Sequence, residues 1–183
     1  MNNKKILVDI DDTIENLCQA WCEWLNDHYN SDVNPDDITE WRIYKFFDNI
    51  PKAEVYKPLY EEDFWKTVTP KLDAIKYLSM LNDEGYDIYL CTNTNYRNVK
   101  IKYELIVQKY FPYISWDKVI VCSKKQMIKA DILIDDGVHN LIGGDYLKVL
   151  LTTPHNKYFD AEKNDVFRVN NWEEIYQVIH LLT

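Results

Sequence analysis

The sequence of 183 residues is poor in glycine and contains no long apolar run. It has only four glycines, so each one is expected to mark a turn of the chain. No apolar stretch approaches the ~20 residues that a membrane-spanning helix needs. The basic start MNNKK is not followed by the longer apolar core of a secretory signal. These features predict a globular protein that does not span a membrane.

Cysteine is also scarce, and the four cysteines include no Cys-x-x-Cys pair. Cys18 and Cys22 lie one helical turn apart beside Trp21, and this spacing is more typical of a helix core than of a metal site. Nothing in the spacing of Cys91 and Cys122 indicates a bridge. We therefore expect free thiols and a reducing, cytoplasmic setting.

Positive charge is in short supply, because 21 Lys and Arg stand against 30 Asp and Glu, for a formal net charge of −9. Such a chain repels nucleic-acid backbones and anionic membranes. The lysine pairs at 4–5 and 124–125 are too short to form a duplex-binding surface. A nucleic acid duplex and a membrane are therefore disfavoured as partners, and a site for an anionic ligand must supply its positive charge locally.

The hydrophobic pattern predicts an α/β fold in which strands alternate with helices from residue 70 onward. Strands are expected at 5–10, 86–92, 118–122, 131–136 and 147–152, and helices at 16–30, 97–110, 171–182 and from Leu72 to an end at Gly85. This alternation is typical of a doubly wound parallel sheet with helices on both faces. Residues 31–69 are irregular in pattern and rich in aromatics. We predict a core domain of residues 1–15 and 70–183 and a small helical cap of residues 16–69, inserted after the first strand.

Polar and charged residues follow each of the first four predicted core strands. They are Asp9, Asp11 and Asp12, then Thr92 and Asn93, then Ser123, Lys124 and Lys125, then Asp135 and Asp136. A single Asp or Asn at such a position often only caps the next helix. Several carboxylates that converge on one edge of a sheet repel one another, and a divalent cation such as Mg²⁺ resolves that conflict. The sequence therefore predicts a metal site at this edge, with lysine and hydroxyl groups as phosphate ligands.

These motifs, in this order, resemble the four-motif set of the haloacid dehalogenase-like superfamily of hydrolases. The first is Asp-x-Asp-x-Thr at residues 9–13, and the others are Thr92, Lys125 and the Asp135–Asp136 pair. Within that superfamily, YLCTNTN, VIVCSKKQMIKADILIDD and LLTTPHNKYF are similar to segments of the 5′(3′)-deoxyribonucleotidases. In that family the lysine stands ten residues before the aspartate pair, which selects Lys125 and leaves Lys124 as the neighbouring alternative. The first motif departs from the Asp-x-Asp-Gly-Val of the animal enzymes.

The resemblance implies a Mg²⁺-dependent phosphatase that works through an aspartyl-phosphate intermediate. Asp9 would be the nucleophile, and Asp11 would be the general acid that protonates the leaving oxygen and then the base that activates water. Mg²⁺ would be held by the Asp9 carboxylate, the Asp11 backbone carbonyl and Asp136. Asp135 would be either a further ligand or a support for the others.

The same resemblance implies a nucleoside monophosphate as substrate, preferably a 5′(3′)-deoxyribonucleotide. Thr92 and Lys125 would bind the phosphoryl oxygens, and Asn93 would assist them. Leu17 stands where the family places a base-contacting aromatic, and Trp41 falls near another. The aromatic side chains of the cap either form its own core or stack on a nucleobase.

Other hypotheses stay open at this stage. One is a phosphatase for another small phosphate ester, such as a sugar phosphate, and another is a phospho-ligand-binding protein without turnover. The intact Asp9–Asp11 pair argues against the second, because a binding protein needs no acid there. A phosphatase acting on nucleic-acid ends is disfavoured by the charge. The four histidines show no metal-ligand spacing and are expected in surface or structural roles, and a homodimer is compatible with the sequence.

Overall fold

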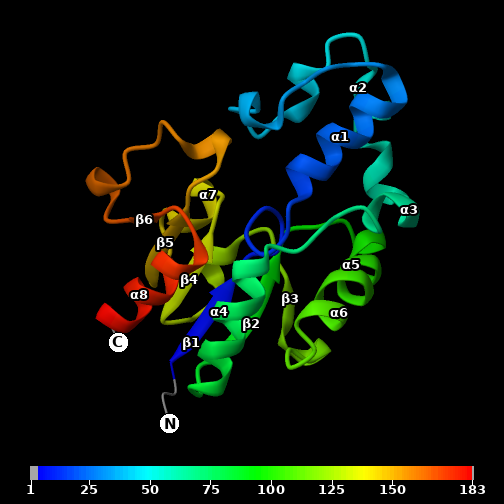
Figure 1. Cartoon of the computed structure of the whole chain (residues 1–183). Helices are drawn as coiled ribbons and strands as arrows, with labels where there is room; N and C mark the ends of the chain where they lie inside the picture. Colours follow the sequence, from blue (N-terminus) through cyan, green and yellow to red (C-terminus); the bar gives the residue numbers. More distant parts are fainter. Residues whose placement is uncertain (1–3, 183) are drawn as a thin grey trace.

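The computed structural model, which describes residues 4–182, contains a six-stranded sheet whose strands are all parallel (Figure 1). The strand order is β3-β2-β1-β4-β5-β6. The strands are β1 (Lys5–Val8), β2 (Asp87–Thr92), β3 (Val119–Val121), β4 (Ile132–Asp135), β5 (Leu147–Leu151) and β6 (Phe167–Val169). The predicted α/β fold with a doubly wound parallel sheet is confirmed.

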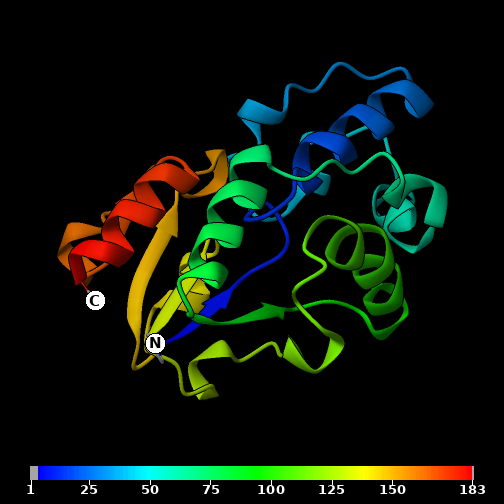
Figure 2. The ribbon, with the colours of Figure 1, turned by 60° about the horizontal axis from the view of Figure 1, so that its bottom comes forward.

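Helices cover both faces of the sheet. They are α1 (Leu17–Tyr29), α2 (Lys52–Tyr56), α3 (Glu62–Trp65), α4 (Leu72–Asp83), α5 (Tyr96–Lys102), α6 (Gln108–Tyr110), α7 (Val138–Leu141) and α8 (Trp172–Leu182). Helices α4 and α8 lie side by side over one face, as Figure 2 shows. None of the helices within residues 4–182 combines the length and apolarity needed to cross a lipid bilayer.

The side chains of β1 are buried on both faces of the sheet. Ile6 and Val8 belong to the large hydrophobic cluster that includes residues of α4 and α8, whereas Leu7 belongs to a second cluster with residues of α7. Successive side chains of a strand point to opposite faces, so a central strand buried on both sides is apolar at every position. This burial explains the continuous run Ile-Leu-Val that precedes the acidic residues.

Three elements differ from the predicted pattern, and one of them is the short helix α7, where no helix is predicted. The helix expected at 97–110 is divided by a π-helical segment, Tyr103–Val107, between α5 and α6. Strand β6 was not predicted, because it has only three residues and a charged one, Arg168, at its centre. Arg168 donates hydrogen bonds to the carbonyl oxygens of Phe159 (2.7 Å) and Asn156 (3.1 Å), so a loop satisfies the charge that interrupts the apolar pattern.

Residues 16–69 leave the sheet after β1 and return to it before α4. Figure 1 shows α1, α2 and α3 beyond the ends of the strands at which β1 and β4 stop. The outgoing and returning chains pair with each other, since Asn16 donates its N–H to Thr69 and Lys71 donates its N–H to Ile14, both at 2.9 Å. The segment predicted to be irregular forms short helices and 3₁₀ turns. The division into a core and a cap domain stays a prediction.

Candidate active site

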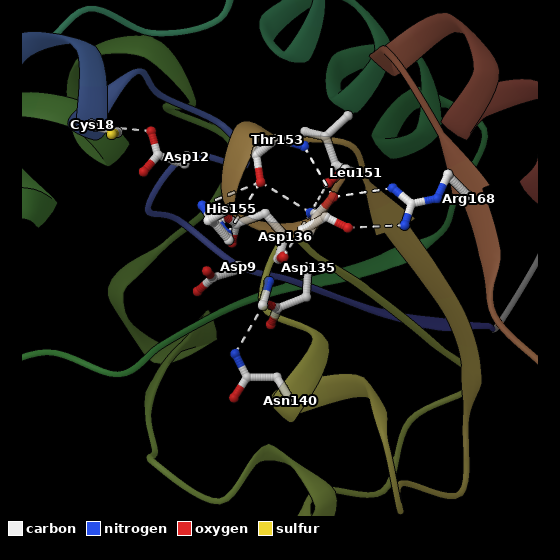
Figure 3. Close-up of polar contacts among 12 residues, drawn as sticks. Asp9, Asp12, Cys18, Asp135, Asp136, Asn140, Leu151, Thr153, His155 and Arg168 are labelled. Atoms are coloured by element: carbon white, nitrogen blue, oxygen red, sulfur yellow. Dashed lines mark hydrogen bonds and ion pairs between the residues drawn. The ribbon is translucent and has the colours of Figure 1, made fainter. Parts of the chain in front are cut away.

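Three buried carboxylates meet where β1 and β4 end. Asp9 follows β1, Asp135 ends β4, and Asp136 follows it, and each offers an oxygen within 4.8 Å of the others (Figure 3). Their exposed fractions are 4%, 0% and 0%. Burial, and then the neighbouring Asp135 carboxylate, raise the pKa of Asp9 well above its usual value. Burial and the charges of Asp12 and Asp135 do the same for the pKa of Asp136.

Asp136 is the member of this cluster whose oxygens accept no hydrogen bond from any of the described residues 4–182. Its only ion-pair contact within that part of the chain is with His155, whose Nε2 lies 3.1 Å from Oδ2. A buried carboxylate without hydrogen bonds is costly to a fold unless a cation compensates it. Carboxylate oxygens are also the donors that hard divalent cations prefer. The cluster therefore suits a divalent metal ion.

Asp135 differs from Asp136 because its oxygens are already used within the protein. Oδ1 accepts hydrogen bonds from the Gly137 N–H (2.8 Å) and the Asn140 side chain (3.0 Å), and Oδ2 accepts one from Lys125 (2.6 Å). Of the two roles considered for Asp135, these contacts favour support of the cluster over direct metal ligation.

Lys125 is the cation at the centre of the cluster. Its Nζ donates to Asp9 Oδ1 and to Asp135 Oδ2, both at 2.6 Å, and the residue is fully buried. Burial alone would lower the pKa of this amine, but the carboxylates of Asp9 and Asp135 outweigh that effect and raise it. Lys124 is exposed, so Lys125 is the lysine that the fold brings to the carboxylates.

Asp11 and Asp12 lie outside the group of three clustered carboxylates, although their charges help to raise the pKa values of Asp9 and Asp136. Both oxygens of Asp11 lie 2.5 Å from the Nζ of Lys102. Asp12 adopts a left-handed backbone conformation (φ 54°), and its Oδ1 accepts a hydrogen bond from the Cys18 N–H at 2.9 Å (Figure 3). This contact satisfies an N–H of the first turn of α1, so the Asp12 side chain stabilises the start of that helix.

Lys102 is a site residue that sequence reasoning missed. Its Nζ also donates to the Thr92 hydroxyl at 3.3 Å, so it links Thr92, which ends β2, to Asp11. The side chain is 3% exposed. The sequence signal for it is weak, because the burial of Lys102 on one helix face with Asn98 and Ile106 is visible only in the structure. A charged residue on the buried face of a helix indicates a specific partner.

The predicted substrate contacts lie in different surroundings. Asn93 is exposed, next to Thr92 at the end of β2. Leu17 and Trp41 line a common cavity of about 240 Å³, and Asp11 lies on its wall. The rest of this lining is mostly apolar and includes Trp21, Ile38, Ile43, Tyr56 and Leu59. The structure therefore joins Leu17 and Trp41 to the proposed acid through one cavity, whereas Asn93 lies outside its lining.

Two histidines stand at the edge of the acidic cluster, although their spacing in the sequence carried no signal. The Trp41 ring meets His139 and His155 edge-on, with ring centroids 5.3 Å and 5.0 Å apart. His155 in turn lies beside Asp136. Its neighbour Asn156 donates to the backbone carbonyl of Asp136 at 2.9 Å, which ties this loop to the end of β4.

Solved structures define the class of this fold. A haloacid dehalogenase family hydrolase from Deinococcus radiodurans, with bound phosphate and sodium, has a TM-score of 0.68 at 12% identity over 98% of this chain and 96% of its own. A predicted phosphatase from Clostridium acetobutylicum has a TM-score of 0.65 at 14% identity over 98% of this chain and 99% of its own. The fold is thus that of the haloacid dehalogenase-like hydrolases.

Sequence comparison identifies the family within this class. The family described as 5′ nucleotidase, deoxy (pyrimidine), cytosolic type C protein matches residues 3–183. A 5′(3′)-deoxyribonucleotidase of Bacillus subtilis is 32% identical over 174 residues, which are 94% of this chain and 96% of the relative. One from Clostridium acetobutylicum is 30% identical over 95% of this chain and 93% of the relative. The chain belongs to this deoxynucleotidase family, which confirms the predicted resemblance.

Proposed function

We propose that the protein is a Mg²⁺-dependent phosphatase of nucleoside monophosphates that prefers 5′(3′)-deoxyribonucleotides. The observation that carries the proposal is the buried group of Asp9, Lys125 and Asp136 at the ends of β1 and β4, in which the Asp136 oxygens accept no hydrogen bond from residues 4–182. The substrate class is supported by the relatives described as 5′(3′)-deoxyribonucleotidases.

Asp9, Asp136 and the backbone carbonyl of Asp11 would hold the Mg²⁺ ion, and Asp135 would fix Lys125 beside them. When bound, the ion would supply positive charge to the phosphoryl oxygens. Lys125 adds a second positive charge from the protein itself. A chain of net charge −9 thereby gains a local site for an anion.

The reaction needs two carboxylates in different roles. An Asp9 oxygen attacks the phosphorus, the ester bond breaks, and the leaving oxygen takes a proton from Asp11, which yields the nucleoside and an aspartyl phosphate. Asp11 then takes a proton from water, which attacks the phosphorus and releases inorganic phosphate with restoration of Asp9. The Thr92 hydroxyl and the Lys125 ammonium group stabilise the charge on the phosphoryl oxygens, and Asn93 assists them.

The cavity lined by Leu17 and Trp41 would take the base and sugar. Its apolar wall suits the faces of a nucleobase, and Asp11 on the same wall places the leaving oxygen next to the acid. We infer that the partner is a free nucleotide, not a duplex or a membrane, because of the net charge. The four free cysteines agree with a cytoplasmic location, and a homodimer stays a prediction.

Phosphate release from a panel of substrates tests the proposal. The panel contains 5′- and 3′-monophosphates of ribo- and deoxyribonucleosides, several sugar phosphates and a single-stranded 3′-phosphorylated oligonucleotide, each with Mg²⁺ and with a chelator. We expect Mg²⁺-dependent turnover that is fastest with deoxyribonucleotides. Asp9→Asn should abolish it, whereas the exposed control Asp48→Asn should not. Faster turnover of a sugar phosphate would refute the substrate class, and nucleotide binding without any release would refute the enzyme.

A further inference from the structure

Lys102 is a second buried lysine at the proposed phosphate site. Lys125 is held between two carboxylates, Asp9 and Asp135. Lys102 instead bridges Asp11, the proposed acid, and Thr92, a proposed phosphate ligand. An ammonium group has three N–H donors. The two oxygens of Asp11 and the hydroxyl of Thr92 account for all three, so a phosphoryl oxygen at this position must replace one of these partners.

Lys102 lies at a change in helix geometry and beside an aromatic ring. The residue ends α5, and the π-helical segment Tyr103–Val107 begins at the next residue. Such segments are rare and are frequently found at functional sites. On its other side, the Nζ atom lies 5.3 Å from the ring centre of Trp65, which comes from α3. An aromatic face attracts a cation and keeps water away from it, so the charge acts at close range without screening.

We propose that Lys102 is a phosphate-binding residue that exchanges partners during the reaction. In the free protein it pairs with Asp11, and in the substrate complex it binds a phosphoryl oxygen beside Thr92. The exchange frees the Asp11 carboxyl to reach the leaving oxygen. This inference rests on the proposed phosphatase function.

The competing explanation is that Lys102 only neutralises Asp11. The two explanations differ in what Lys102 does when Asp11 carries no charge. In an Asp11→Asn background the ion pair is already absent, so a purely neutralising lysine would have no effect on anion binding. A phosphate-binding lysine would still donate to the anion. The comparison therefore separates the two roles without relying on turnover.

The first measurement is calorimetric titration of inorganic phosphate, with Mg²⁺ present, into three proteins: Asp11→Asn alone, with Lys102→Met, and with Lys100→Met. Lys100 lies on the same helix, is exposed and contacts only the surface residue Glu104 among the ion pairs described. We expect Lys102→Met to weaken phosphate binding by ~10- to 100-fold, the effect of losing a hydrogen bond to a charged group. Lys100→Met should leave it unchanged. Equal affinities in all three proteins would overturn the proposal.

The second measurement is steady-state kinetics on an otherwise unaltered chain. Lys102→Met should lower kcat/KM for nucleotides by ~10²- to 10³-fold, because a donor to the developing charge is lost, and Lys100→Met should match the wild type. If Lys102→Met does not fold, Lys102→Gln replaces it in both assays. A wild-type protein that releases no phosphate from any nucleotide would refute the proposed function, while the titrations would still decide whether Lys102 binds the anion. Wild-type kcat/KM in a folded Lys102 variant would overturn the inference alone.

Discussion

Replacement of Asp136 by asparagine is expected to stabilise the metal-free protein and to remove its stabilisation by Mg²⁺. Asp136 is fully buried, and within the described part of the chain neither carboxylate oxygen has a hydrogen bond. Leaving a polar group buried and unpaired costs about 1–3 kcal/mol. An amide has nearly the same shape, does not repel Asp9 and Asp135, and brings two donors. For a chain of this length the gain corresponds to a rise of about 2–12 °C in Tm.

The assay is thermal unfolding in a chelator and in Mg²⁺, with the exposed Asp48→Asn as control. Wild type and control should gain about 2.7 kcal/mol when Mg²⁺ is present at a hundred times its Kd. Asp136→Asn should gain almost nothing, because it lacks a ligand. If Asp136→Asn melts below wild type in the chelator and is stabilised by Mg²⁺ to the same extent, Asp136 is not the unpaired ligand that we infer.

The pH dependence of the metal-free protein follows from the same residues. Burial raises the pKa of Asp9 and Asp136 well above the ordinary 3.8. Above pH 3.8 and up to these raised values, the folded protein therefore binds more protons than the unfolded chain. Its free energy of unfolding falls as the pH rises through that window. Urea unfolding at a series of pH values in a chelator measures this slope, and a rising free energy across the window would contradict it.

Three further predictions concern single residues. Lys125→Met should lower the unfolding free energy by about 3–5 kcal/mol, because it leaves buried carboxylates unpaired. The neighbouring Lys124→Met should lower it by almost nothing. Similar urea midpoints for the two variants would contradict the buried pairing. Trp41→Ala should raise KM for nucleotides by about 5- to 100-fold through lost stacking. The affinity for inorganic phosphate should stay constant. An unchanged KM would show that Trp41 packs in the cap and does not contact the base. Asp12→Ala should lower the unfolding free energy by about 1–2 kcal/mol, because it removes the hydrogen bond to the start of α1. Asp12→Asn keeps an acceptor and should retain most of this free energy. Equal losses in the two variants would show that the hydrogen bond contributes little.

The strand-end residues show what could be predicted for the site. Parallel strands bring their ends together, so the sequence predicts one edge of the sheet for Asp9, Thr92, Asp135 and Asp136. The structure places each of them at or just after the end of its strand. Lys125 was selected by its spacing from Asp135, and it contacts both Asp9 and Asp135. The direction of each side chain was not predictable in this way. The Asp11 side chain pairs with Lys102 and the Asp12 side chain bonds to the start of α1, although both residues follow the same strand as Asp9.

Local apolar patterns and short motifs were enough to predict the parallel α/β fold, the family and the set of strand-end residues. The pairing of the charges, in contrast, depends on the tertiary structure. Asp11 and Lys102 are 91 positions apart and meet where α5 contacts α3 and the Thr92 hydroxyl at the end of β2. His155 reaches Asp136 through a loop held by Asn156. Such contacts depend on how whole helices and strands are arranged in space, and a local pattern of residues does not determine that arrangement.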